Sequence, residues 1–108
     1  MNSVDHFKPE IFVPASHLDA VKIALQDADA GHIGNYDSCL AYSPVKGTWR
    51  SLAGATPYIG TVGTVSEEDE IKVEVNVTGD KLKETVAAVK RVHPYAEPLI
   101  NVIPLYMM

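Results

Sequence analysis

The sequence has a single cysteine, few aromatic residues and no concentration of basic charge. Cys39 alone excludes an internal disulfide and a zinc site built from cysteine pairs. The chain carries 14 acidic and 9 basic residues, for a net charge of −5. Nucleic-acid binding needs a basic face that neutralises phosphates, and no basic cluster here exceeds Lys90-Arg91. We therefore expect no nucleic-acid partner.

Long hydrophobic runs are also missing. No apolar segment has the length of a membrane span, and no basic segment followed by an apolar run marks a signal peptide. The apolar fraction of 46% and the charged fraction of 21% are typical of a globular protein. A chain of 108 residues has room for one hydrophobic core. We expect one cytoplasmic domain over residues 1–108, without a membrane partner.

The hydrophobic pattern predicts six elements in the order strand, helix, strand, strand, helix, strand. The clearest is a strand in which Ile71, Val73 and Val75 alternate with polar residues, so that one face is buried and one is wet. The second helix opens at Gly79 and ends before Pro94. The expected strands are 10–14, 36–42, 71–78 and 99–105, and the expected helices are 16–31 and 79–93.

This order predicts an α+β fold. Two strand–helix–strand units with right-handed crossovers make a ferredoxin-like βαββαβ sandwich, with a four-stranded antiparallel sheet and both helices on one face. The other face of the sheet has no helix to cover it. Because an apolar sheet face needs a partner layer, we expect the chain to form a homo-oligomer.

Residues 43–63 are expected to form a small hairpin or excursion between the second and third strands. Pro44-Val45-Lys46-Gly47 predicts a turn, and Thr48-Trp49-Arg50 would pair back as a hairpin arm. Residues 51–63 contain three glycines and a proline, which predicts a long irregular connection. Such connections are more often functional than accidental. The acidic run 67–70 is interpreted as a solvated turn before the next strand.

Two short segments combine histidine, tyrosine and turn-forming residues directly after a predicted helix. They are Gly-His-Ile-Gly-Asn-Tyr at 31–36 and His-Pro-Tyr-Ala-Glu-Pro at 93–98. We expect both helices to run the same way, which places the two turns at one end of the sheet but on opposite edges. A site that uses both His32 and His93 is then expected between neighbouring subunits.

Three interpretations of these segments are open. His32, His93 and Glu97 offer ligands suited to a divalent transition metal such as zinc, copper or nickel, although their spacing is not that of a helical site. The two imidazoles also titrate in the range of general acid–base catalysis, but no nucleophile or cofactor motif accompanies them. As structural groups, which is the interpretation we favour, they would bind the last carbonyls of the two helices. The candidate ligand-binding neighbours are Asn35, Tyr36 and Tyr95.

The two segments in this order, with Gly60-x-x-Gly63 between them, resemble the domain inserted in bacterial proteins of the NIF-three-like family. Members of that family are also named type-two GTP cyclohydrolases. The resemblance runs from Glu10 to Tyr106 and implies a fold similar to the CutA and PII signalling proteins, which are usually trimeric. Residues 43–63 occupy the place of the PII interaction loop, which implies a protein partner there. Ala96 departs from the family, which commonly carries Glu at this position, and this weakens a metal site at Glu97.

Full-length members of the family bind two metal ions in a separate pair of lobes, and no residue of this chain matches those ligands. The resemblance therefore implies no hydrolase activity for a stand-alone version of the domain. We expect a non-enzymatic, cytoplasmic binding or regulatory module, trimeric by resemblance, that binds a small ligand or a protein partner at subunit interfaces. The alternative is a divalent-metal-binding protein that uses His32, His93 and Glu97 from neighbouring chains.

Overall fold

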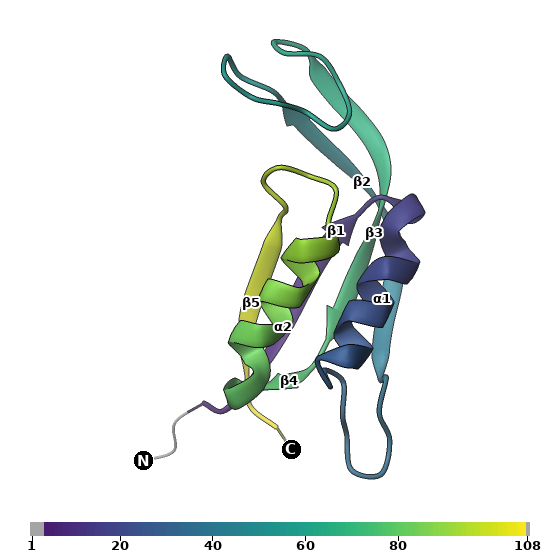
Figure 1. The fold of residues 1–108 in the computed structure, drawn as a ribbon, viewed down its shortest axis with the longest axis vertical. Coiled ribbons are helices and arrows are strands. Elements are labelled where there is room, and N and C mark those ends of the chain that lie inside the picture. The colour runs from purple at the N-terminus through teal and green to yellow at the C-terminus, as the bar shows by residue number, and fades with distance from the viewer. Residues whose placement is uncertain (1–3, 108) are drawn as a thin grey trace.

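The computed structural model describes residues 4–107 and shows two helices packed on one face of an antiparallel sheet (Figure 1). No helix in this part of the chain is long and apolar enough to cross a membrane. The elements in chain order are β1 (His6–Val13), η1 (Ala15–His17), α1 (Leu18–Asp27), β2 (Leu40–Arg50), β3 (Val65–Val75), β4 (Val77–Thr78), α2 (Gly79–Val92) and β5 (Ile100–Leu105).

β1 is the central strand of the sheet. β5 pairs along one side of β1, β3 and β4 pair along its other side, and β2 lies outside β3. β4 keeps the register of β3 on the far side of Asn76, so the two act as one interrupted strand. The predicted ferredoxin-like plan, with four strand positions and both helices on one face, is confirmed.

The core lies between the sheet and the helices. Alternate residues of β1 and β3 point toward the helices, and Ile11, Val13 and Val73 have no exposed surface. Val21 and Leu25, one helical turn apart on α1, are equally buried. Full burial of such side chains stabilises a fold by roughly 1.5–3 kcal/mol each. The alternation that predicted the third strand is therefore the pattern that forms the core.

β2 and β3 form one long hairpin, with pairing from Leu40–Val75 to Arg50–Val65. Its outer half and the connecting loop project past the helices (Figure 1), so the expected excursion exists as the end of this hairpin. The predicted turn at 44–47 is wrong, because Pro44 lies within β2 and pairs with Ile71 of β3. An edge strand accepts proline because one side of its backbone has no sheet partner.

The acidic run 67–70 is also part of this hairpin. It lies in β3, so its interpretation as a solvated turn is wrong. Successive side chains of a strand point to opposite faces. Asp69 therefore pairs with Lys46 at 2.6 Å in solvent, whereas Glu70 points to the other face and is only 7% exposed.

The two helices run in opposite directions (Figure 1). β1 runs upward in this view, α1 returns downward, and α2 rises again after the β2–β3 hairpin. The expectation that both helices run the same way is wrong, because β1 and β3 are antiparallel and each helix reverses the direction of the strand before it. The turn after α1 and the turn after α2 therefore lie at opposite ends of the molecule.

Candidate ligand-binding site

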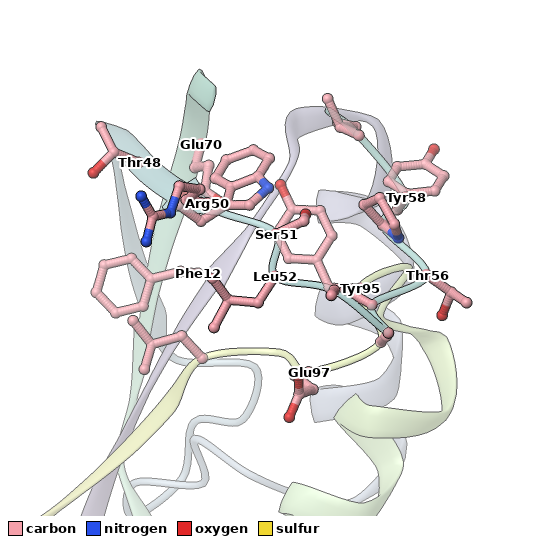
Figure 2. A pocket seen from close by; sticks show the side chains of 18 residues that line it. Phe12, Thr48, Arg50, Ser51, Leu52, Thr56, Tyr58, Glu70, Tyr95 and Glu97 are labelled. Carbon is pink, nitrogen blue, oxygen red and sulfur yellow. The ribbon is translucent and has the colours of Figure 1, made fainter. Parts of the chain in front are cut away.

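A cavity of about 690 Å³ opens between the β2–β3 loop and the segment that precedes β5 (Figure 2). The loop contributes residues 51–59, and the segment before β5 contributes Tyr95, Ala96, Glu97 and Leu99. β1 and the outer hairpin add Phe12, Trp49 and Glu70. Figure 2 shows Tyr95 in the middle of this lining, with Tyr58 on one side and Glu70 on the other.

Aromatic rings form a continuous wall of the cavity around Tyr95. The ring of Trp49 lies 5.8 Å from the ring of Tyr95, and the ring of Tyr58 lies 6.1 Å from it on another side. His17 at the start of α1 meets Tyr58 edge to face at 5.9 Å. These spacings are those of rings in contact. The wall therefore joins three separate parts of the chain and holds the loop against the sheet.

His93 fixes the position of Tyr95 through hydrogen bonds to the backbone. The residue is 8% exposed, and its Nε2 lies 2.7 Å from the backbone carbonyl of Phe12. The backbone N–H of Tyr95 donates to Nδ1 of His93 at 3.1 Å. Since Nδ1 accepts, Nε2 carries the proton and donates to the Phe12 carbonyl. Burial lowers the pKa of His93, and the Phe12 carbonyl opposes that shift only in part.

The hydroxyl of Tyr95 is buried and has no hydrogen-bond partner among residues 4–107. Burial raises the pKa of this hydroxyl far above its ordinary value, and the nearby Glu70 carboxylate raises it further. The group is therefore a neutral phenol at every physiological pH. Glu70 forms no ion pair with any of residues 4–107, and its carboxylate fills the space above Gly47 where a Cβ would lie.

A second, polar cavity of about 230 Å³ lies at the opposite end of the molecule. There Asp29 bonds Nδ1 of His32 at 2.9 Å and pairs with Lys81 at the start of α2. The Asp29 carboxylate raises the pKa of His32, while Lys81 first and His32 second lower the pKa of Asp29. The cluster is solvated, with the side chains of Asp29 and His32 about half exposed at 44% and 50%. Solvent therefore screens these direct contacts and weakens their contribution to stability.

The structure divides the predicted site residues between these two ends. His93, Tyr95 and Glu97 lie around the large cavity, with Tyr95 and Glu97 in its lining. His32 lies at the far end, near the start of α2, and α2 has 14 residues, which separates the ends by about 21 Å. Asn35 and Tyr36 are exposed on the same turn as His32. A site between subunits that includes both histidines stays a prediction.

Neither His32 nor His93 binds a helix carbonyl through its ring. The interpretation that the two imidazoles bind the last carbonyls of the helices is therefore wrong. The His93 ring contacts the β1 backbone and the His32 ring contacts Asp29 and the Gly34 carbonyl. Both ring nitrogens of each residue are engaged, and a metal would have to displace one of these bonds. Within residues 4–107, no three His, Cys, Asp or Glu side chains are grouped as a metal site. The metal prediction therefore requires more than one chain.

Sequence reasoning named only Tyr95 and Glu97 from this lining, and among the residues it missed are Trp49, Tyr58 and Glu70. Trp49 was expected in a hairpin arm, Tyr58 in an irregular loop, and Glu70 in a solvated turn. The register of the long hairpin places Trp49 and Glu70 on one face of neighbouring strands. The signal in the sequence was the alternation of side chains along a strand through the acidic run 67–70. That signal predicts a buried Glu70 only if the neighbouring strand is allowed to contain Pro44.

Comparison with known proteins tests the family resemblance. No family model matches the chain. It is 41% identical over 99 residues to a GTP cyclohydrolase 1 type 2 homolog of Halalkalibacterium halodurans, covering 92% of this chain and 27% of that protein. The protein of the same name from Mycobacterium tuberculosis is 43% identical over 97 residues, covering 88% of this chain and 25% of that protein. A crystal structure of a Bacillus cereus protein related to NIF3 superposes with a TM-score of 0.83 at 31% identity, covering 97% of this chain and 27% of that chain.

The chain is homologous to one segment of NIF3-family proteins. The resemblance inferred from residues 31–36 and 93–98 is thereby confirmed. The chain spans about a quarter of the length of the curated NIF3-family relatives it matches. More distant neighbours share the fold over nearly their whole length. One is CutA, a divalent cation tolerance protein of Archaeoglobus fulgidus, with a TM-score of 0.70 and 20% identity over 95% of this chain and 86% of that chain. Another is the GlnK–ATP complex of B. subtilis, with a TM-score of 0.64 and 17% identity over 96% of this chain and 86% of that chain.

Proposed function

We propose that this NIF3-family segment is an oligomeric binding module whose small-ligand site is the cavity lined by Trp49, Tyr58 and Tyr95. The observation that carries the proposal is the Tyr95 hydroxyl, which is buried in the cavity lining and has no hydrogen-bond partner in the part of the chain that the structure describes. An unsatisfied buried hydroxyl costs about 1–3 kcal/mol, and native structures seldom leave one. A polar group of a bound molecule would satisfy it.

The dimensions and rigidity of the cavity support the same function. Its volume of about 690 Å³ falls among the roughly 300–1,000 Å³ of small-molecule sites. Its lining is mainly apolar and aromatic with a few polar groups, which is the usual composition of such sites. His93 bonds β1 and the Tyr95 backbone at once, so the central aromatic residue is positioned before any ligand arrives.

Self-association is the second part of the proposal. The sheet face away from the helices carries Ile103 of β5, which is 38% exposed, beside Lys8 of β1. Lys8 bonds Glu74 at 2.8 Å and Glu10 at 3.2 Å on the same face. Other apolar side chains that share this face are Phe12, Val45 and Leu105. A second copy of the chain would cover this mixed surface, as a trimer if the family resemblance extends to assembly.

The hairpin end is a further candidate contact surface. Leu52, Tyr58 and Val62 in the loop are 62%, 53% and 46% exposed. Large exposed apolar side chains that are close together in a loop are typical of interaction surfaces. We include a protein partner at this loop, within the predicted range 43–63, as part of the proposed regulatory role.

Native mass spectrometry of gently purified protein tests the proposed function. We expect the wild type to form an oligomer that retains extra mass of a small molecule, and Tyr95→Phe to form the same oligomer with less of that mass. Tyr36→Phe is the matched control, because Tyr36 is 74% exposed at the other end of the molecule. A wild-type protein without retained mass, or equal retention by Tyr95→Phe, would contradict a ligand site at Tyr95.

A further inference from the structure

A buried acid, Glu70, lines the large cavity. Glu70 is 7% exposed, lines the cavity and has no ion-pair partner within the described residues. A buried carboxylate is costly unless a cation or several hydrogen-bond donors accompany it. Arg50 also lines the cavity, but it is exposed and forms no ion pair with Glu70. The buried Glu70 carboxylate therefore stands at the wall of the cavity without an ion pair among residues 4–107.

Like the Glu70 carboxylate, the aromatic wall favours a positively charged ligand. Trp49 and Tyr58 flank Tyr95, and Trp49 shares one face of the hairpin with Glu70. The faces of aromatic rings carry negative potential and attract cations within about 6 Å. A second carboxylate, Glu97, lies on the rim. An anionic ligand would meet two carboxylates and the ring faces, and the one cationic side chain that residues 4–107 place in the lining, Arg50, is exposed, so the electrostatics favour a cation.

The unpartnered Tyr95 hydroxyl narrows the cation to one that carries N–H groups. The Tyr95 O–H can turn toward the nearby Glu70 carboxylate, which only accepts, and this leaves the lone pairs of the phenol oxygen open to a donor. A quaternary ammonium has no hydrogen to donate to either group. A primary ammonium has three N–H donors and a compact charge.

We propose that the cavity binds a small primary amine in its protonated form. The ammonium donates to the Glu70 carboxylate and to the Tyr95 hydroxyl oxygen, and the carbon skeleton of the ligand lies against the rings of Trp49 and Tyr58. This inference rests on the proposed function and adds the chemical class of its ligand. It assigns Glu70 as the residue that decides the charge of that ligand.

Trp49 gives a direct reporter, because it is the only tryptophan of the chain and lines the cavity. We would titrate the full chain with four matched probes and follow Trp49 emission. The probes are phenethylamine, its trimethylammonium analogue, 2-phenylethanol and 3-phenylpropanoate. We expect phenethylamine to bind about tenfold or more tightly than the alcohol and the quaternary analogue, and the carboxylate to bind weakest.

Glu70→Gln removes the charge and keeps the shape. We expect it to lower phenethylamine affinity by about tenfold or more and to lower 2-phenylethanol affinity much less. Glu67→Gln is the matched control, because Glu67 is an exposed residue of β3 outside the cavity lining. Tyr95→Phe removes a single oxygen and should weaken phenethylamine binding about fivefold. It provides a second test if Glu70→Gln does not fold, which circular dichroism will show.

The results separate this proposal from the function on which it rests. Equal binding of the amine and the alcohol, tighter binding of the carboxylate, or no loss in a folded Glu70→Gln would overturn the amine class. No change of Trp49 emission with any probe would overturn it too. In each case the proposed function is judged separately, by whether Tyr95→Phe loses the mass that the native wild-type oligomer retains.

Discussion

The backbone N–H of Tyr95 donates a hydrogen bond to Nδ1 of His93 at 3.1 Å, across the turn that follows α2. The same imidazole contacts the Phe12 carbonyl at 2.7 Å through Nε2. One neutral side chain therefore joins the end of β1 to the start of the cavity lining. Because a charged imidazole has no acceptor, protonation of His93 must break the bond to Tyr95.

Stability should depend on pH through His93. Burial lowers the pKa of the folded-state imidazole below its ordinary value of 6.5. The stability linked to this group is therefore complete above about pH 6.5 and is lost as the pH falls through that value toward the lowered folded-state pKa. We expect urea denaturation to show a decline from pH 8 to pH 5 that is smaller in His93→Gln. Equal declines in both proteins would contradict this linkage.

The second histidine should behave in the opposite way. Asp29 raises the pKa of His32, so Asp29→Asn should return that pKa toward its ordinary value. Asn tolerates the left-handed backbone of this position, where φ is 57°, so the variant should keep the turn. An NMR titration of the His32 ring measures the shift. Asp37→Asn, which alters an exposed carboxylate in the same loop, should leave the His32 titration unchanged.

Gly47 should be required for the position of Glu70. An added Cβ would overlap with the Glu70 carboxylate, which must then move. Gly47→Ala should destabilise the fold by about 1 kcal/mol or more and change Trp49 emission. Urea denaturation and a fluorescence spectrum test this, with Ser43→Ala on the same strand as the control. An unaltered Trp49 spectrum and unaltered stability would show that Glu70 moves freely.

The open face of the sheet should carry the contact between copies. Ile103→Asp would place a charge on this face, and we expect it to reduce the molar mass measured by light scattering. Ile23→Asp is the control, because Ile23 is 56% exposed on α1, away from the proposed contact. If Ile23→Asp dissociates the oligomer and Ile103→Asp does not, the contact lies on the helical face instead.

Metal binding by the predicted set, His32, His93 and Glu97, should need neighbouring chains, because His32 lies near the start of α2 and His93 follows its end, and α2 is about 21 Å long. We expect native mass spectrometry to find zinc only on oligomers, and the double variant His32→Ala/His93→Ala to lose it. Zinc on the monomer, or unchanged uptake by the double variant, would contradict this ligand set.

The predicted site residues met different outcomes. Tyr95 and Glu97 line the cavity, and their segment stood out in the sequence because it combines polar, aromatic and turn-forming residues after a helix. His32 belongs to a solvated cluster at the other end. Trp49 and Glu70 were missed because their common face depends on the hairpin register, which pairs positions far apart in the chain.

The sequence by itself determined the order of the elements and the ferredoxin-like plan. Periodicity is a local property, so the alternation of Ile71, Val73 and Val75 predicts a strand with one buried face wherever that strand lies. Only the tertiary structure decided that Pro44 lies within an edge strand and that Glu70 is buried beside Tyr95. These features depend on contacts between distant segments, and a local signal such as Pro–x–x–Gly is compatible with both a turn and an edge strand.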